Sequence, residues 1–265
     1  MSLREAARKP SREPDSYIEA TRRPLDSLVF LLPLIIIYEV GTLYWLPGWS
    51  AGPDVNVGAH VLLRMFFRLF GPSSYHLPAL LVVAILLSWH IASGAPWRVR
   101  WSAVVGIAGE SLCLALPLLL LQDSLHAGLT GMPDQRWASS AVLSIGAGVY
   151  EELVFRLGVI TIASMVLIDL LRLPRNGSMV AIVLLAAGLF ASYHHVYPAT
   201  EPFRMVPFLF RAAAGIYLGG IFVLRGFGVT AGVHTCYNLL IITVAAAGSE
   251  SQAAAVAVAP LANAG

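Results

Sequence analysis

The sequence predicts an all-α integral membrane protein, a polytopic bundle of about seven to eight transmembrane helices. Of its 265 residues, 57% are hydrophobic and only 12% are charged, and the mean hydropathy is +0.74. Soluble domains carry about 25% charged residues, whereas a helix needs about 20 predominantly apolar residues to cross a bilayer. The apolar segments of this chain are too many and too long for a soluble core.

Seven apolar segments meet the length requirement for a membrane span. They run over residues 27–46, 77–94, 101–122, 138–173, 178–196, 207–224 and 227–247. The fourth segment is longer than one span needs, so it is either strongly tilted or broken near Gly146–Gly148. Residues 60–70 alternate bulky apolar residues with Arg64 and Arg68, which favours an interfacial helix. That helix or the C-terminal tail could also form an eighth span.

The sequence divides into a polar leader at residues 1–26, a transmembrane domain at 27–248 and a low-complexity tail at 249–265. An N-inside arrangement places the leader and most loop arginines on the cytoplasmic side, as the positive-inside rule requires. Arginine and alanine richness favours a bacterial cytoplasmic membrane. The basic residues form no stripe that would bind nucleic acid. Cys113 and Cys236 lie in apolar segments and are expected to be free thiols.

Three charged residues interrupt the fourth apolar segment: Glu151, Glu152 and Arg156. On insertion scales each such charge costs about 2.5–3.5 kcal/mol at the bilayer midplane, so a functional site is the default interpretation. Glu152 and Arg156 stand four residues apart and can form an ion pair within a helix, whereas Glu151 points about 100° away. Glu151 is therefore left without a partner and is the candidate general base. A buried ion-pair network that fixes helix packing is the alternative.

Two further segments carry paired polar or aromatic groups at helical spacing. Phe190 and His194 lie four residues apart, so the phenyl ring can pack against the imidazole, while His195 faces elsewhere. His234 and Asn238 also share a helix face and can aim two hydrogen-bond donors at one point, as an oxyanion hole requires. Taken singly, each histidine could serve only to hydrogen-bond neighbouring helices.

These residues form three motifs in order along the chain. The motifs are Glu151-Glu152-x-x-x-Arg156, Phe190-x-x-x-His194 and His234-x-x-x-Asn238. Together they resemble the signature motifs of the intramembrane glutamic endopeptidases, the CAAX-protease and bacteriocin-processing family that includes the type II CAAX prenyl endopeptidases. The resemblance covers about residues 138–245, and no motif of residues 1–137 matches.

The resemblance implies a hydrolase that cleaves a peptide bond within the membrane. Glu151 and His194 would activate a water molecule, and His234 and Asn238 would form the oxyanion hole. The supporting residues would be Glu152, Arg156 and Phe190. The resemblance also implies a mechanism without a metal or cofactor, although one glutamate and two histidines could hold zinc.

The expected partners are the lipid bilayer and a membrane-associated protein or peptide, which could be lipidated or carry a C-terminal tag. A proton-coupled transporter is an alternative, because intramembrane carboxylates and histidines also build proton relays. The sequence shows no internal repeat of the transporter kind. A non-catalytic membrane scaffold or immunity protein is the third possibility. The sequence does not predict the oligomeric state.

Strict alternation of the spans places His194 near the end of the fifth span and His234 near the start of the seventh, at different depths. Either the helices are staggered, or the loop at 225–232 or the proline-rich loop at 198–207 sinks into the protein, and we predict a sunken loop. Five other polar residues of apolar segments could pair across helices, with the arginine the best counter-ion for an acid. They are Glu39, His90, Glu110, Asp169 and Arg211.

Overall fold

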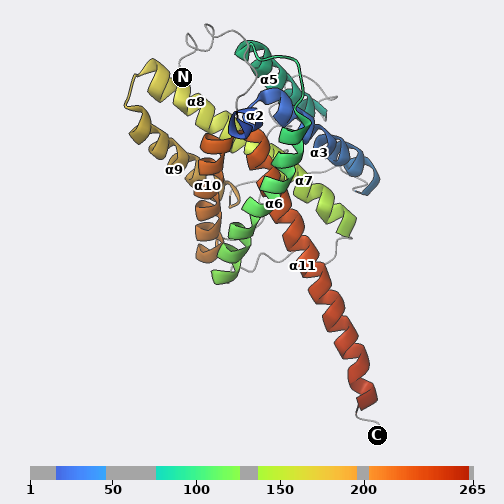
Figure 1. Cartoon of the computed structure of the whole chain (residues 1–265). Helices are drawn as coiled ribbons and strands as arrows, with labels where there is room; N and C mark the ends of the chain where they lie inside the picture. The colour runs from blue at the N-terminus through green and yellow to red at the C-terminus, as the bar shows by residue number, and fades with distance from the viewer. Residues whose placement is uncertain (1–15, 46–75, 126–136, 196–202, 263–265) are drawn as a thin grey trace.

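The computed structural model describes residues 16–45, 76–125, 137–195 and 203–262, and every element in these ranges is a helix (Figure 1). The elements in chain order are α2 (Tyr17–Thr21), α3 (Pro24–Trp45), α5 (Leu77–Ser93), α6 (Trp101–Ser124), α7 (Trp137–Glu152), η3 (Leu153–Ile160), α8 (Thr161–Ser164), η4 (Met165–Leu170), α9 (Arg175–Tyr193), α10 (Met205–Arg225) and α11 (Phe227–Ala262). The predicted interfacial helix at 60–70 lies outside the described residues.

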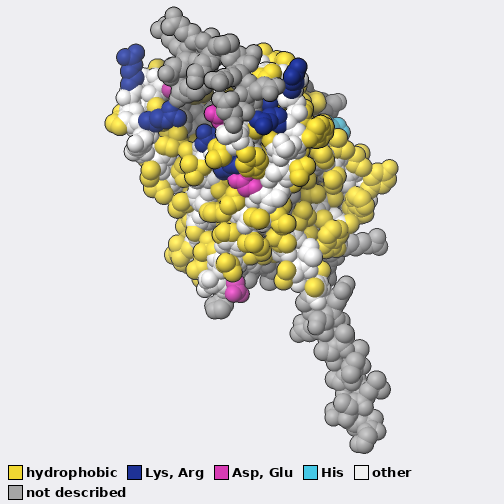
Figure 2. All heavy atoms as spheres, viewed as in Figure 1, with side chains coloured by type: hydrophobic (Ala, Val, Ile, Leu, Met, Phe, Trp, Pro, Cys, Tyr) yellow, Lys and Arg dark blue, Asp and Glu magenta, His cyan; other side chains and the backbone are white. Residues whose placement is uncertain are grey.

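The structure confirms an all-α membrane bundle. Among the described residues, six helical segments are long and apolar enough to cross a membrane, and α5 is a shorter apolar helix of 17 residues. The six are Pro24–Trp45, Trp101–Ser124, Trp137–Leu170, Arg175–Tyr193, Met205–Arg225 and Phe227–Ala247. Hydrophobic side chains cover most of the described surface in view, as a membrane-embedded protein requires (Figure 2).

The fourth apolar segment continues through its glycines without a break. Gly146 and Gly148 lie inside α7, and the chain then continues as the π-helical segment η3 directly after Glu152. The helical run Trp137–Leu170 has 34 residues, and at about 1.5 Å per residue it is longer than the roughly 30 Å hydrocarbon layer. Figure 1 shows it crossing the bundle obliquely. Of the two predicted alternatives, tilting therefore fits and a break at the glycines does not.

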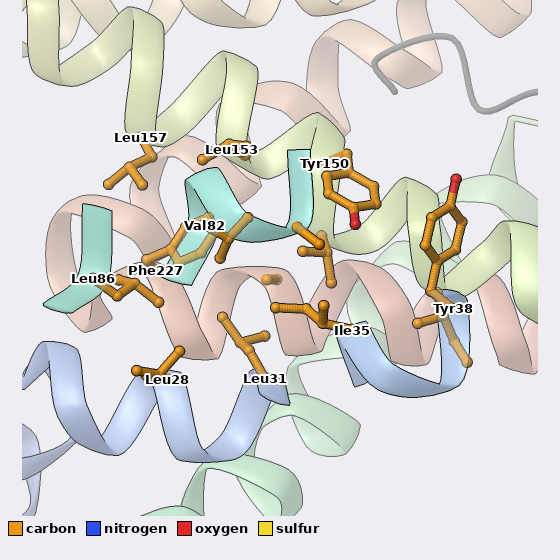
Figure 3. Close-up of a cluster of buried hydrophobic side chains, with 14 of the residues drawn as sticks. Leu28, Leu31, Ile35, Tyr38, Val82, Leu86, Tyr150, Leu153, Leu157 and Phe227 are labelled. Carbon is orange, nitrogen blue, oxygen red and sulfur yellow. The ribbon is translucent and has the colours of Figure 1, made fainter. Parts of the chain in front are cut away.

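The first part of helix α11 lies in the core of the bundle and packs against α3, α6, α7 and α10, and the helix then continues beyond the bundle (Figure 1). Figure 3 shows one part of this core, where Phe227 of α11 meets Leu28 and Leu31 of α3 and Val82 and Leu86 of α5. These side chains are almost fully buried. The core thus ties the start of α11 to the N-terminal half of the chain, which carries none of the three motifs.

Small residues let the helices that carry the motifs approach their neighbours closely, as is usual for helices packed in membranes. A Cβ atom at Gly215 of α10 would lie 2.9 Å from the Cα of Ala187 in α9. A Cβ atom at Gly148 of α7 would lie 2.7 Å from the backbone nitrogen of Thr235 in α11. Helices α9 and α10, and helices α7 and α11, can therefore pack with their backbones nearly in contact.

Basic side chains tie together one end of the bundle. Arg22 donates from Nε to the carbonyl of Leu224 at 2.8 Å, at the C-terminal end of α10. Arg225 donates from Nε to Glu110 of α6 at 2.6 Å, and the hydroxyl of Tyr17 donates to the same carboxylate at 2.8 Å. Glu110 therefore pairs with Arg225 rather than with Arg211. We call the end of the bundle formed by these contacts the basic end.

Exposed aromatic side chains mark both ends of the membrane-spanning region. Trp97 and Trp101 are exposed in the segment that joins α5 to α6, close to the basic end. Tyr44 and Trp45 are exposed at the other end of α3, and Trp137 is exposed at the start of α7. Tryptophan and tyrosine gather at the two membrane interfaces, so the 22 residues of α3, about 33 Å long, span the bilayer between these groups.

The remaining polar residues have mixed outcomes. Glu39 pairs with His76, at 2.6 Å between Oε2 and Nδ1, whereas Asp169 is exposed on η4. His90 is fully buried and packs edge-on against Trp97, with 4.6 Å between the ring centroids. Cys113 and Cys236 are free thiols, as predicted.

Candidate active site

Glu152 is the centre of a buried charged cluster at the end of α7. Its Oε1 atom lies 3.0 Å from Nη1 of Arg156 and 2.7 Å from Nδ1 of His234. The carboxylate is fully buried, and the other two side chains are nearly so. The ion pair predicted from the four-residue spacing is therefore confirmed. One oxygen of Glu152 joins α7, η3 and the distant helix α11.

Glu151, for which the sequence predicts no partner on its own helix, faces a residue of a distant helix. Its Oε2 atom lies 3.8 Å from Nε2 of His234. This imidazole therefore lies between two adjacent carboxylates, with Nδ1 on Glu152 and Nε2 facing Glu151. Helical spacing describes neighbours on the same helix only, so it left Glu151 without a partner there, and His234 approaches from α11. Both glutamates are thus held near one ring.

Phe190 is the aromatic centre of the site and connects three of the motif residues. Its ring centroid lies 5.0 Å from that of His194 and 6.1 Å from that of His234. The guanidinium carbon of Arg156 lies 4.5 Å from the same centroid, in a cation–π contact. The predicted packing of Phe190 against His194 is confirmed. Phe155 and Tyr193, which the motifs do not include, complete this aromatic group, since the Phe155 ring lies 5.4 Å from Phe190 and 5.3 Å from Tyr193.

His194 follows the last residue of α9, and a hydrogen bond orients its ring. Its Nδ1 atom lies 2.8 Å from the carbonyl oxygen of Phe190. A carbonyl oxygen can only accept, so Nδ1 carries the proton, and Nε2 of the neutral ring is a proton acceptor. The contact also satisfies one of the carbonyl groups that a helix end leaves unpaired. The structure brings His194 to the site through Phe190, whereas Glu151 faces His234.

Asn238 lies one helical turn after His234 on α11, as the spacing predicts. Its side chain is half-buried and makes no hydrogen bond within the part of the chain that the structure describes.

The structure brings His194 and His234 to the same place without a sunken loop at residues 227–232. Residues 227–232 are not a sunken loop: α11 begins at Phe227 directly after Gly226, whose φ of 88° allows the chain to reverse. That prediction was wrong for 225–232, and residues 198–202 lie outside the described ranges. His234 is seven residues into α11, so it lies about 10 Å from the start of the helix. Helix α9 runs obliquely toward the middle of the bundle (Figure 1), which brings its C-terminal end to the same place.

Arg211 of α10 is a further charged residue of the site. Its side chain is buried and close enough to Glu151 and His194 to interact electrostatically with both. The sequence marked it as a counter-ion without assigning it to the site. Arg211 lies one turn before Gly215, whose carbonyl oxygen lies 3.4 Å from Nη2 of Arg156. The same face of α10 therefore borders Arg156 and carries Arg211.

Within the described ranges, no group of three or more histidine, cysteine, aspartate or glutamate side chains is arranged to hold a metal ion. His194 and His234 both pack against the Phe190 ring, and the Nδ1 atom of each is already engaged, with the carbonyl of Phe190 and with Glu152 respectively. The zinc alternative therefore calls for a direct experiment.

The fold and the site define a class of membrane protein that holds carboxylates, a guanidinium and imidazoles together within a helical bundle. Residues 133–240 match the family model described as type II CAAX prenyl endopeptidase Rce1-like, so the family resemblance that the sequence motifs indicated is confirmed. The matched residues include all three motifs and the whole of the site. No curated protein and no solved structure matches the chain.

Proposed function

We propose that the protein is an intramembrane endopeptidase of the glutamic type, which hydrolyses a peptide bond of a membrane-associated protein or peptide. The observation that carries the proposal is the position of His234 between Glu151 and Glu152, inside the residues that match a family of endopeptidases. The family points to prenylated proteins with a C-terminal CAAX sequence as the first substrates to test.

Glu151 is the proposed base. Its carboxylate oxygen is 3.8 Å from Nε2 of His234, which is too long for a hydrogen bond, so this carboxylate can accept from a water instead. A water held by Glu151 and by Nε2 of His194 donates a proton to Glu151 while its lone pair attacks the peptide carbonyl carbon. Glu151 then passes its proton to the leaving amine as the C–N bond breaks, which leaves a new carboxylate and a new amine.

His234 and Asn238 are the proposed oxyanion hole. The Nδ1–H of His234 donates to Glu152, so a proton on Nε2 makes the ring a donor directed into the site. The side-chain amide of Asn238, one turn away, supplies the second donor. Such donors act where negative charge develops on the carbonyl oxygen, and the removal of one typically slows catalysis by about 10²–10³.

The test uses the purified protein in liposomes with a farnesylated peptide that ends in Cys-aliphatic-aliphatic-X, and an unmodified peptide of the same sequence. We expect cleavage by the wild type, and loss of cleavage in Glu151→Gln and His234→Ala. Asp169→Asn is the matched control, because Asp169 is an exposed acid on the same helical run, and it should cleave normally. Wild-type cleavage by Glu151→Gln would overturn the proposal. Cleavage that stops in a chelator and returns with zinc would replace the metal-free mechanism.

We also propose that the basic end faces the cytoplasm of a bacterial cell. The arginines of this end follow the positive-inside rule for that orientation. In a background with both cysteines replaced, a cysteine at Arg175, at the start of α9, should be labelled only from the cytoplasmic side. A cysteine at the exposed Trp137 should be labelled only from the other side. The reverse labelling pattern would contradict the orientation.

A further inference from the structure

The residue before Glu151 belongs to a second hydrogen-bonded group that the three motifs do not include. The hydroxyl of Tyr150 donates to Oε1 of Glu39 on α3 at 3.0 Å. The other oxygen of Glu39 lies 2.6 Å from Nδ1 of His76, directly before α5. Because a carboxylate only accepts, both partners donate to it. The Tyr150 ring also packs edge-on against Tyr38, with 5.1 Å between centroids (Figure 3).

This group reaches from the core of the bundle to its surface. Tyr150 is only 1% exposed, and a buried hydroxyl is stable only with a hydrogen-bond partner. The side chain of Glu39 is 19% exposed and that of His76 is 61% exposed. Glu39 therefore supplies the acceptor that Tyr150 needs, and His76 donates to the other oxygen of the same carboxylate from outside the core.

The position of Tyr150 along the helix relates this group to the site. Consecutive residues of a helix point about 100° apart, so Tyr150, Glu151 and Glu152 point in three directions. Tyr150 is bound to α3 and Glu152 is bound to α11 through His234. Glu151 lies between these two attachments, so α7 cannot rotate or shift at this residue without breaking one of them.

Small errors of placement are costly in such a site. A displacement of about 1 Å can lower a catalytic rate by about 10². The distance between Glu151 and His234 is 3.8 Å, and a rotation of α7 at Tyr150 changes it directly.

We propose that Tyr150, Glu39 and His76 are positioning residues that hold Glu151 at its working distance from His234. The proposal rests on the proposed function of Glu151. It assigns a catalytic purpose to a glutamate in the first span, which lies outside all three motifs and outside the residues that match the family.

The activity test compares Tyr150→Phe, Glu39→Gln and the double variant with the wild type on the farnesylated peptide. We expect each single variant to lower kcat by about ten- to hundredfold with a KM within about twofold of the wild type, because geometry is lost and binding is kept. The double variant should be no slower than the slower single variant. Tyr44→Phe is the matched control, since Tyr44 is on α3 and 76% exposed, and it should behave as the wild type. Unchanged kcat in both single variants, or losses that multiply in the double variant, would overturn the proposal.

A second measurement needs no substrate. Infrared difference spectra taken across a pH series report the protonation of Glu151, identified as the band that Glu151→Gln removes. We expect Tyr150→Phe to shift the midpoint of that band and Tyr44→Phe to leave it in place. Superimposable titrations of Tyr150→Phe and the wild type would refute the positioning role. Cleavage by Glu151→Gln would instead refute the proposed function, so the two failures are distinct.

Discussion

His234 and Arg156 share a single oxygen atom of Glu152, at 2.7 Å and 3.0 Å respectively. Glu152 therefore neutralises a cation of its own helical run and, at the same time, orients the imidazole that faces Glu151. The two adjacent glutamates have different surroundings, and substitutions of each should have different consequences.

Glu152→Gln should destabilise the protein, whereas Glu151→Gln should not. The first leaves the fully buried Arg156 without its carboxylate, and breaking a buried ion pair costs about 3–5 kcal/mol. The second removes a carboxylate whose oxygen is 3.8 Å from Nε2 of His234, too far for a hydrogen bond, so no hydrogen bond to this histidine is lost. Thermal unfolding in detergent should show a lowered melting temperature for Glu152→Gln only, and cleavage should be lost in Glu151→Gln at wild-type stability. A lowered melting temperature for Glu151→Gln only would show that Glu151 is the structural residue and would contradict the assignment of the two glutamates.

Phe190→Leu should slow catalysis more than it weakens binding. The substitution removes the ring that contacts His194 and Arg156, including a cation–π contact worth about 0.5–2 kcal/mol. Both side chains then gain freedom to reorient. We expect kcat to fall about tenfold at an unchanged KM, because the catalytic groups are misplaced while substrate binding is kept. Steady-state peptide cleavage measures both constants. A variant with normal kcat would show that the ring serves only as packing.

Gly148→Ala should separate α7 from α11. A Cβ atom at this position would lie 2.0 Å from Oγ1 of Thr235 and 2.7 Å from its backbone nitrogen. The backbone cannot move aside without displacing His234 next to it, so both the melting temperature and cleavage should fall. Gly188→Ala on α9 is the matched control, because its Cβ would meet no atom within 4 Å. Equal behaviour of the two variants would contradict the close packing.

Tyr17 and Glu110 provide a test at the basic end. Burial, and then the hydrogen bond to Glu110, raise the pKa of Tyr17 from 10.0 to about 12. Because this folded-state pKa exceeds the unfolded value, the contribution to stability is complete below about pH 10 and is lost as the pH rises toward 12. Absorbance titration, with Tyr17→Phe as the reference, should give a midpoint near 12. The midpoint should fall in Glu110→Gln, and a midpoint unchanged by Glu110→Gln would exclude the hydrogen bond as a cause.

The contacts that the sequence predicted correctly are those within one helix. Glu152 with Arg156, and Phe190 with His194, are four residues apart, and the helical repeat alone places them together. The helices themselves were also predictable, because long apolar segments admit few structures in a bilayer.

The contacts that could not be predicted depend on how separate helices cross. His234 meets Glu152 from 82 residues away, which requires the tilt of the fourth span and the direct start of α11 after Gly226. The prediction assumed upright, alternating spans, without this tilt and without this direct connection. It therefore placed His194 and His234 at different depths. The Tyr150–Glu39 contact, between residues 111 positions apart, had no motif to indicate it.

The one-residue connection at Gly226 limits how the length of this chain can vary. Elsewhere in a membrane protein, loop insertions and deletions are tolerated because slack chain absorbs them. Between α10 and α11 there is no such slack. One residue added between Gly226 and His234 would turn the imidazole by about 100° and move it by about 1.5 Å along α11, and Asn238 would move with it. The geometry of the charged cluster therefore depends on the number of residues from this glycine to the histidine, even where the residues themselves could differ.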